Sequence, residues 1–206
     1  TARTVVECLV DSFSHIKRTG FGPHGLMKLL TGDWNDAMGG YALRSGATVA
    51  ELMSRGESTC NAAMAAAIIP RLADALGLAQ NSGLQIPGGN NTLRSMRQLA
   101  KQQAQALRRA WNGEWLSRAW MPVNSSYNPD GWFCTNGEDY RLCLEPQPWA
   151  IMATKMGESV LSSAERSTLV QSMENLLHLG APGTWDVSSA QRGITGAAVA
   201  SKCWHN

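Results

Sequence analysis

Apolar residues recur every three or four positions along most of this chain, which is the pattern of amphipathic helices. The first such run extends from Val5 to Ile16 and predicts a helix that stops before Gly20. A Ser-x-x-Glu sequence at residues 162–165 predicts the start of a later helix, because it is a capping box. That helix carries the apolar residues Leu169, Met173, Leu176 and Leu177. The remaining helices are predicted over about 57–78, over 93–110 and just after Pro146. No strand-like alternation is sustained, so the predicted fold class is all-α.

Polar and aromatic residues collect on long segments between these helices. Residues 21–47 and 122–141 are rich in Gly, Asn and other turn formers, and the chain is again Gly- and Ser-rich from Gly180 onward. Long structured connections are usually functional. No linker divides the chain, so residues 1–206 are expected to form one domain. Helix pairs with their chemistry on one set of loops favour part of an (α/α)6 toroid or barrel, and a plain helix bundle remains the alternative.

Tryptophan is unusually abundant for a chain of this length. There are eight Trp against three Phe and three Tyr. A single Trp is most often a core residue, but four of these lie in polar contexts that contain Gly or Pro, where they would suit the edge of a binding cleft. They are Trp34, Trp132, Trp149 and Trp185.

Charge and apolar content exclude some partners. The net charge is +2, and the densest basic residues, between Arg94 and Arg109, have the spacing of a solvated helix face. No basic stripe with interleaved aromatics is present, so no nucleic-acid partner is predicted. No apolar run approaches the ~20 residues that a bilayer span needs, so no membrane partner is predicted either.

Cysteine and histidine usage predicts neither a metal site nor a disulfide framework. The five Cys and four His show no metal-binding spacing, and no Cys-x-x-Cys pair occurs. Reduced, mostly buried thiols are therefore expected, in the cytoplasm or another reducing intracellular compartment.

The most informative motif is residues 32–38, Gly-Asp-Trp-Asn-Asp-Ala-Met. The indole of Trp34 can stack on the apolar face of a sugar, and a neighbouring carboxylic acid can protonate a glycosidic oxygen. Asp33 and Asp36 provide two such carboxyl groups, although Asp also commonly bonds nearby loop amides. The motif therefore favours carbohydrate chemistry.

Several segments, in order, resemble the catalytic domain of the inverting glycoside phosphorylases of the cellobiose and chitobiose phosphorylase type. Residues 22–26 (Gly-Pro-His-Gly-Leu) and 32–38 look like the family's Gly-Pro-His-Gly-Leu and Gly-Asp-Trp-Asn-Asp-Gly-Met. Residues 56–58 (Gly-Glu-Ser) are similar to its Gly-Glu-Ser helix start. The resemblance continues at residues 111–119 (Trp-Asn-Gly-Glu-Trp-Leu-Ser-Arg-Ala) and 144–153 (Leu-Glu-Pro-Gln-Pro-Trp-Ala-Ile-Met-Ala), and a short match ends the chain at Cys203 to Asn206.

The resemblance implies an (α/α)6 barrel preceded by a β-sandwich domain in a chain several hundred residues longer. The sequence opens on Thr1 rather than Met, which also suggests a piece of something larger or a processed product. The upstream sandwich and the remaining barrel helices are absent from these 206 residues. The expected partners are therefore an oligosaccharide, phosphate, and the remaining segments of a longer chain or other subunits.

The resemblance also implies roles for individual residues. Asp36 would be the general acid, Trp34 would stack on the acceptor-side sugar, and Asp33 would support the loop or a sugar hydroxyl. No cofactor is expected, since inorganic phosphate is the co-substrate, and His205 is the candidate phosphate ligand. The other predicted substrate-binding residues are Glu138, Glu145, Gln147 and Trp149.

Structural roles compete with these assignments at some positions. Glu145 could instead cap the helix that follows Pro146, and Glu57 is expected to stabilise the N-terminus of its own helix. His24 follows Pro23 in a turn and is expected to be structural.

The preferred interpretation is inverting phosphorolysis of β-linked gluco-oligosaccharides to sugar 1-phosphate. Two alternatives stay open. The chain could be a non-catalytic, barrel-derived subunit that binds glycan or packs into an assembly, because an incomplete toroid exposes apolar helix faces. It could also be an inverting glycoside hydrolase on the same fold.

Overall fold

The computed structural model describes residues 3–30, 46–122, 130–133, 142–154 and 160–177. These residues are mostly helical, which confirms the predicted all-α character, while the (α/α)6 barrel stays a prediction. The helices are α1 (Val5–Thr19), α3 (Val49–Arg55), α4 (Thr59–Asn81), α5 (Gly89–Leu107), α6 (Pro146–Thr154) and α7 (Ser163–Leu177), with a 3-10 turn η1 (Arg108–Ala110). Three short strands accompany them, β1 (Glu57–Ser58), β2 (Ala119–Trp120) and β3 (Trp132–Phe133).

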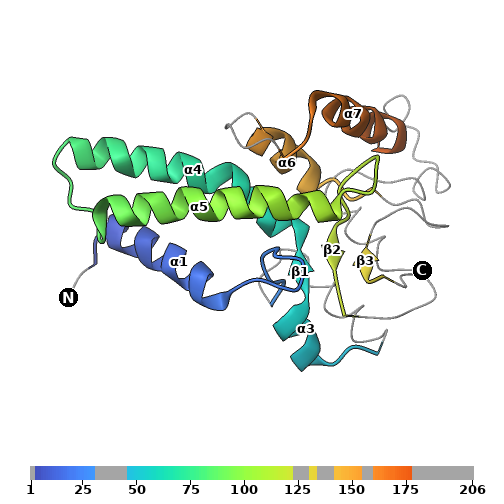
Figure 1. Ribbon diagram of the computed structural model, residues 1–206, viewed down its shortest axis with the longest axis horizontal. Coiled ribbons are helices and arrows are strands. Elements are labelled where there is room, and N and C mark those ends of the chain that lie inside the picture. Colours follow the sequence, from blue (N-terminus) through green and yellow to red (C-terminus); the bar gives the residue numbers. More distant parts are fainter. Residues whose placement is uncertain (1–2, 31–45, 123–129, 134–141, 155–159, 178–206) are drawn as a thin grey trace, which may run out of the picture.

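The long helices α4 and α5 form a hairpin through the middle of the described structure (Figure 1). Small side chains on α4, such as Ala63 and Ala67, are fully buried and let the helices approach closely. Helix α1 lies along the left part of the hairpin in Figure 1. Phe13 of α1 joins Ile69 and Met96 in one apolar cluster. At the other end of the hairpin, α6 and α7 pack on α4 and α5. A second, larger apolar cluster, which we call the main cluster, contains residues from all four of these helices.

A small antiparallel sheet lies beside the end of the hairpin, in the order β1-β2-β3. Glu57 is opposite Trp120, and Trp120 is opposite Trp132. Residues 27–29 extend the pairing beyond β1, since Ser58 N–H donates to the Met27 carbonyl at 2.8 Å and Leu29 N–H to that of Gly56 at 2.8 Å. The sheet was not predicted, because two-residue strands are too short to show alternation.

The predicted helices at the start of the chain, after Pro146 and after residues 162–165 are confirmed, as are the two long central ones. Helix α3 was not predicted, because it has seven residues and Leu52 is its one buried position. Its start carries a sequence signal that could have revealed it. Thr48 and Glu51 form a capping box, with Glu51 N–H donating to the Thr48 hydroxyl at 3.2 Å.

Helix α4 is long and apolar enough to cross a membrane, by length and composition alone, and it is the one such helix in the described ranges. Arg71 and Asp74 interrupt this helix, so it is not an unbroken apolar run, but its alanine and isoleucine residues raise its mean hydropathy. The core helices of water-soluble proteins meet the same criterion, and α4 packs against both α5 and α6. Its composition is weak evidence for a membrane.

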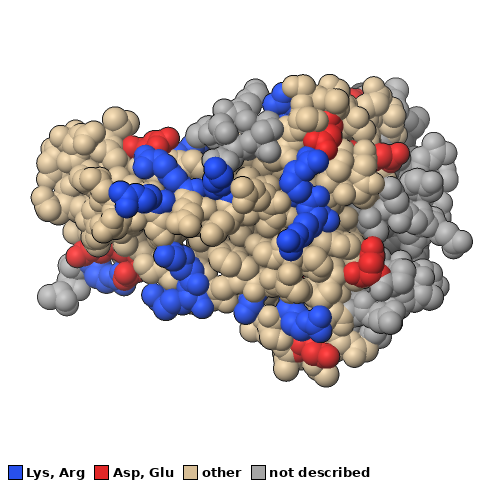
Figure 2. All heavy atoms as spheres, viewed as in Figure 1, with Lys and Arg blue, Asp and Glu red and all other residues tan. Residues whose placement is uncertain are grey.

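The predicted solvated basic face is confirmed on α5 and η1. Arg94, Arg97 and Lys101 are exposed, and Arg108 and Arg109 continue the row. Figure 2 shows Lys and Arg side chains predominating over Asp and Glu across this view. Arg97 pairs with Asp74 of α4 at 2.8 Å, so part of this charge is neutralised within the molecule.

Glu165 both caps α7 and attaches it to the central hairpin. Its Oε2 accepts from Ser162 N–H at 2.7 Å, and Ser162 Oγ accepts from Glu165 N–H at 3.2 Å, which confirms the predicted capping box. The Arg108 guanidinium donates to the same carboxylate at 2.7 Å. This bond to Arg108, followed by the bonds to Ser162, lowers the pKa of Glu165 to about 2.

We expect Glu165→Gln to lower the free energy of unfolding by about 1 kcal/mol at neutral pH, since the ion pair is partly exposed. A lowered carboxyl pKa stabilises the folded state above the ordinary pKa of Glu, and that stabilisation is lost as the pH falls from about 4.5 towards 2. The difference between parent and variant should therefore shrink across this range in urea denaturation. Glu114→Gln, at an exposed position, is the control, and a difference that stays constant with pH would contradict the assignment.

Candidate functional site

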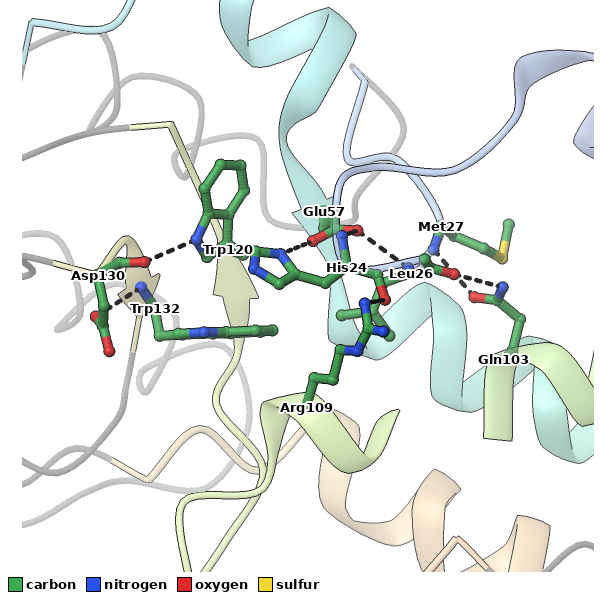
Figure 3. Close-up of polar contacts among 10 residues, drawn as sticks. His24, Leu26, Met27, Glu57, Gln103, Arg109, Trp120, Asp130 and Trp132 are labelled. Carbon is green, nitrogen blue, oxygen red and sulfur yellow. Dashed lines mark hydrogen bonds and ion pairs between the residues drawn. The ribbon is translucent and has the colours of Figure 1, made fainter. Parts of the chain in front are cut away.

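The buried carboxylate of Glu57 organises the candidate site (Figure 3). Its side chain is fully buried, and Oε1 accepts hydrogen bonds from His24 N–H at 2.9 Å and Leu26 N–H at 3.0 Å. Oε2 lies 2.6 Å from Nδ1 of the His24 ring. A carboxylate that is shielded from water needs hydrogen-bond donors from the protein, because burying an unpaired charge costs several kcal/mol of free energy or more. Glu57 on β1 therefore fixes the turn at residues 22–26.

Gly22 is required by the closeness of this turn to Glu57. A Cβ at Gly22 would lie 2.2 Å from Glu57 Cγ, well inside van der Waals contact. Gly25 has a φ of +85°, which a side chain would disfavour. Leu26 then enters the core with no exposed surface. The Gly-Pro-His-Gly-Leu motif is thus shaped to wrap around one carboxylate.

Helix α5 and η1 hold the same turn from the other side. The Gln103 side chain is fully buried, with Oε1 accepting from Met27 N–H at 3.0 Å and Nε2 donating to the Gly25 carbonyl at 3.0 Å. Arg109 donates to the carbonyl of His24 at 3.0 Å. The turn is therefore attached to the sheet, to α5 and to η1.

Two tryptophans flank the ring of His24. The ring centroids of His24 and Trp120 are 4.8 Å apart in an edge-to-face arrangement, and those of His24 and Trp132 are 5.0 Å apart at 49°. Trp120 is nearly buried, and its indole N–H donates to the Asp130 carbonyl at 2.8 Å. The guanidinium of Arg55 lies 5.5 Å from the Trp120 ring. The side chain of His24 keeps 28% of its surface exposed. We call the three rings of His24, Trp120 and Trp132 the aromatic edge.

The expectation that Glu57 stabilises its own helix is corrected by these contacts. Ser58 is the N-cap of α4, and its side chain accepts from Asn61 N–H at 3.0 Å. Glu57 lies one residue earlier, on β1, and its carboxylate faces the turn instead. The turn position of His24 agrees with a structural role, but its partly exposed ring beside two tryptophans was not foreseen.

The motif with Asp33, Trp34 and Asp36 lies outside the described residues. The described residues on either side of it, however, meet at the sheet. Leu29 and Ala47 belong to one apolar cluster with residues of β2 and β3, namely Ala119 and Phe133, and with Leu52 and Met121. Glu138 and His205 also lie outside the described residues.

The remaining predicted site residues lie around α6. Glu145 Oε2 is 3.8 Å from Nε of Arg118, in an ion pair whose side chains are 11% and 2% exposed. Gln147 is fully buried, and its amide bonds the backbone of Leu116 through both Oε1 and Nε2, at 3.0 and 2.8 Å. Trp149 is half-buried against the main cluster. Roles of these three residues in substrate binding stay predictions.

Within the described ranges, no group of three or more His, Cys, Asp or Glu is placed to hold a metal ion.

The family model for the catalytic domain of the glycosyl hydrolase 94 superfamily matches residues 1–181. That range includes the turn, the sheet and all the helices described above. No curated protein matches the chain.

We expect Gly22→Ala to destabilise the fold by about 1–3 kcal/mol, the usual cost of overpacking a filled site. Gly77→Ala in α4 is the matched control. Its Cβ would meet only Leu93 Cδ1 at 3.6 Å, and alanine should stabilise the helix by about 0.5–1 kcal/mol. Urea denaturation measures both. Equal stabilities of the parent and Gly22→Ala would show that the turn does not need its close approach to Glu57.

Proposed function

This chain belongs to the glycosyl hydrolase 94 superfamily, and we propose that it is an inverting glycoside phosphorylase of the cellobiose and chitobiose phosphorylase type. The proposed substrates are β-linked gluco-oligosaccharides and inorganic phosphate. A phosphate oxygen attacks the anomeric carbon, the bond to the glycosidic oxygen breaks, and that oxygen takes a proton from Asp36. The products are a sugar 1-phosphate of inverted configuration and the shortened saccharide.

The observation that carries this proposal is the family match over residues 1–181, which includes the Asp33–Asp36 motif. The family supports glycoside phosphorylase or hydrolase chemistry in general. The preference for a phosphorylase comes from the resemblance of residues 22–26 and 32–38 to motifs of that group.

The proposed chemistry needs one protein carboxylic acid, because phosphate replaces the activated water of an inverting hydrolase. Asp36 is assigned as this acid, with Trp34 stacking on the acceptor-side sugar. His205 is proposed to contribute to the phosphate site. Remaining barrel segments, from a longer chain or from other subunits, are proposed to complete the binding surface.

We expect Asp36→Asn to reduce phosphorolysis by roughly 10²- to 10⁴-fold, the usual contribution of a general acid. The assay is phosphate-dependent release of sugar 1-phosphate from a β-linked glucose oligosaccharide. A donor whose leaving group is 2,4-dinitrophenolate needs little protonation, so the variant should lose much less of its rate on that donor. Asp74→Asn, on the exposed face of α4, serves as the control and should keep full activity on both donors.

Three results would contradict this proposal in different ways. Cleavage at the same rate without phosphate would identify a hydrolase. Equal losses of rate on both donors would show that Asp36 is not the general acid. Binding of the oligosaccharide without any cleavage would favour a non-catalytic glycan-binding subunit.

A further inference from the structure

The two ring nitrogens of His24 differ in their contacts: Nδ1 lies against the Glu57 carboxylate, whereas Nε2 points elsewhere. A carboxylate only accepts hydrogen bonds, and Glu57 already accepts from two backbone N–H groups, so Nδ1 carries the hydrogen of the 2.6 Å contact. Nε2 has no hydrogen-bond partner among the described residues. In Figure 3, Nε2 is turned away from Glu57, toward the side where the two indoles lie.

The backbone around His24 is held in place by hydrogen bonds to three side chains. The backbone on either side of His24 is bonded to Glu57, and the His24 carbonyl accepts from Arg109. Gln103 fixes the next two peptide groups. A ligand that bonds Nε2 would therefore lose little affinity to the ordering of the protein side chain.

Trp132 supplies the apolar part of the same surface. It is half-buried on β3, next to the His24 ring, whereas Trp120 is nearly buried and has its N–H bonded within the protein. An indole face beside a fixed polar nitrogen matches the two sides of a sugar ring, with apolar C–H groups on the face and hydroxyls around the edge. A hydroxyl can donate to a neutral imidazole and accept from a protonated one, so the match does not depend on the charge of His24.

We propose that His24 and Trp132 form a sugar-contacting subsite, in which Nε2 hydrogen-bonds a hydroxyl of the oligosaccharide and the Trp132 indole packs against a sugar ring. This inference rests on the proposed function, because it names further residues that hold the same class of substrate. Glu57 is then a positioning residue, which acts by fixing the orientation of His24.

Two substitutions at His24 separate this role from a purely structural one. Asparagine places its amide nitrogen near the position of Nδ1 and can keep the bond to Glu57, but it has nothing at Nε2. Glutamine places its amide nitrogen near Nε2 but does not reproduce the bond from Nδ1. We expect His24→Asn to raise the Kd for a β-1,4-linked glucose tetrasaccharide about tenfold, while His24→Gln raises it less than about threefold and lowers the melting temperature more.

The measurements are isothermal titration with the tetrasaccharide and thermal unfolding of each variant of the full chain. His15→Asn, at an exposed position on α1, is the matched control and should leave Kd unchanged. Trp132→Leu should also raise Kd, because it removes the aromatic face.

The outcomes separate this inference from the proposed function. If the parent binds and cleaves the oligosaccharide and His24→Asn binds it equally well, the subsite is wrong and the phosphorylase proposal stands. A reversed order, with His24→Gln the weaker binder, would leave His24 a structural role only. A parent protein that has its remaining barrel segments and neither binds nor cleaves the tetrasaccharide would overturn both proposals.

Discussion

The fully buried carboxylate of Glu57 is the constraint on which the rest of the site depends. It is too far from water to be solvated, so the protein must supply its hydrogen-bond donors. Two backbone N–H groups and one ring nitrogen of a single turn meet this need. Removing a partner from such a group typically costs about 3–5 kcal/mol, a large part of the net stability of a domain. The geometry of the turn is thus dictated by the charge that it surrounds.

The position of Glu57 in the chain extends this constraint beyond the turn. It lies on β1, is opposite Trp120 on β2, and is followed directly by the N-cap of α4. A displacement of the carboxylate would move the sheet and the start of the longest described helix together. The aromatic edge around His24 is therefore rigid. A rigid edge suits a residue that must hold a sugar in a defined orientation, since binding does not have to order it first.

Much of the helical framework could be predicted from the sequence, because helices of more than a dozen residues repeat their apolar face several times. The contact between His24 and Glu57 could not, since the two residues are separated by 33 positions and no periodicity links them. The resemblance singled out both Gly-Pro-His-Gly-Leu and Gly-Glu-Ser as family motifs without indicating that one surrounds the other. The steric demand at Gly22 is the physical reason that the two motifs belong together.

The sheet was not predicted because each of its strands has two residues, which is too short for an alternating pattern. Strands of two residues provide very few backbone hydrogen bonds, and buried side-chain amides bond the backbone of the segments next to the sheet. Gln103 pairs with the backbone at Gly25 and Met27, and Gln147 pairs with both the N–H and the carbonyl of Leu116. Each amide thus imitates one peptide group of a neighbouring strand. A glutamine among apolar residues in a helical pattern looks like an error in the core, but here its amide satisfies backbone groups that have no strand beside them. The prediction of Gln147 as a substrate ligand relies on its place in a motif, and its contacts in the structure add a second role, which is to satisfy the backbone N–H and carbonyl of Leu116.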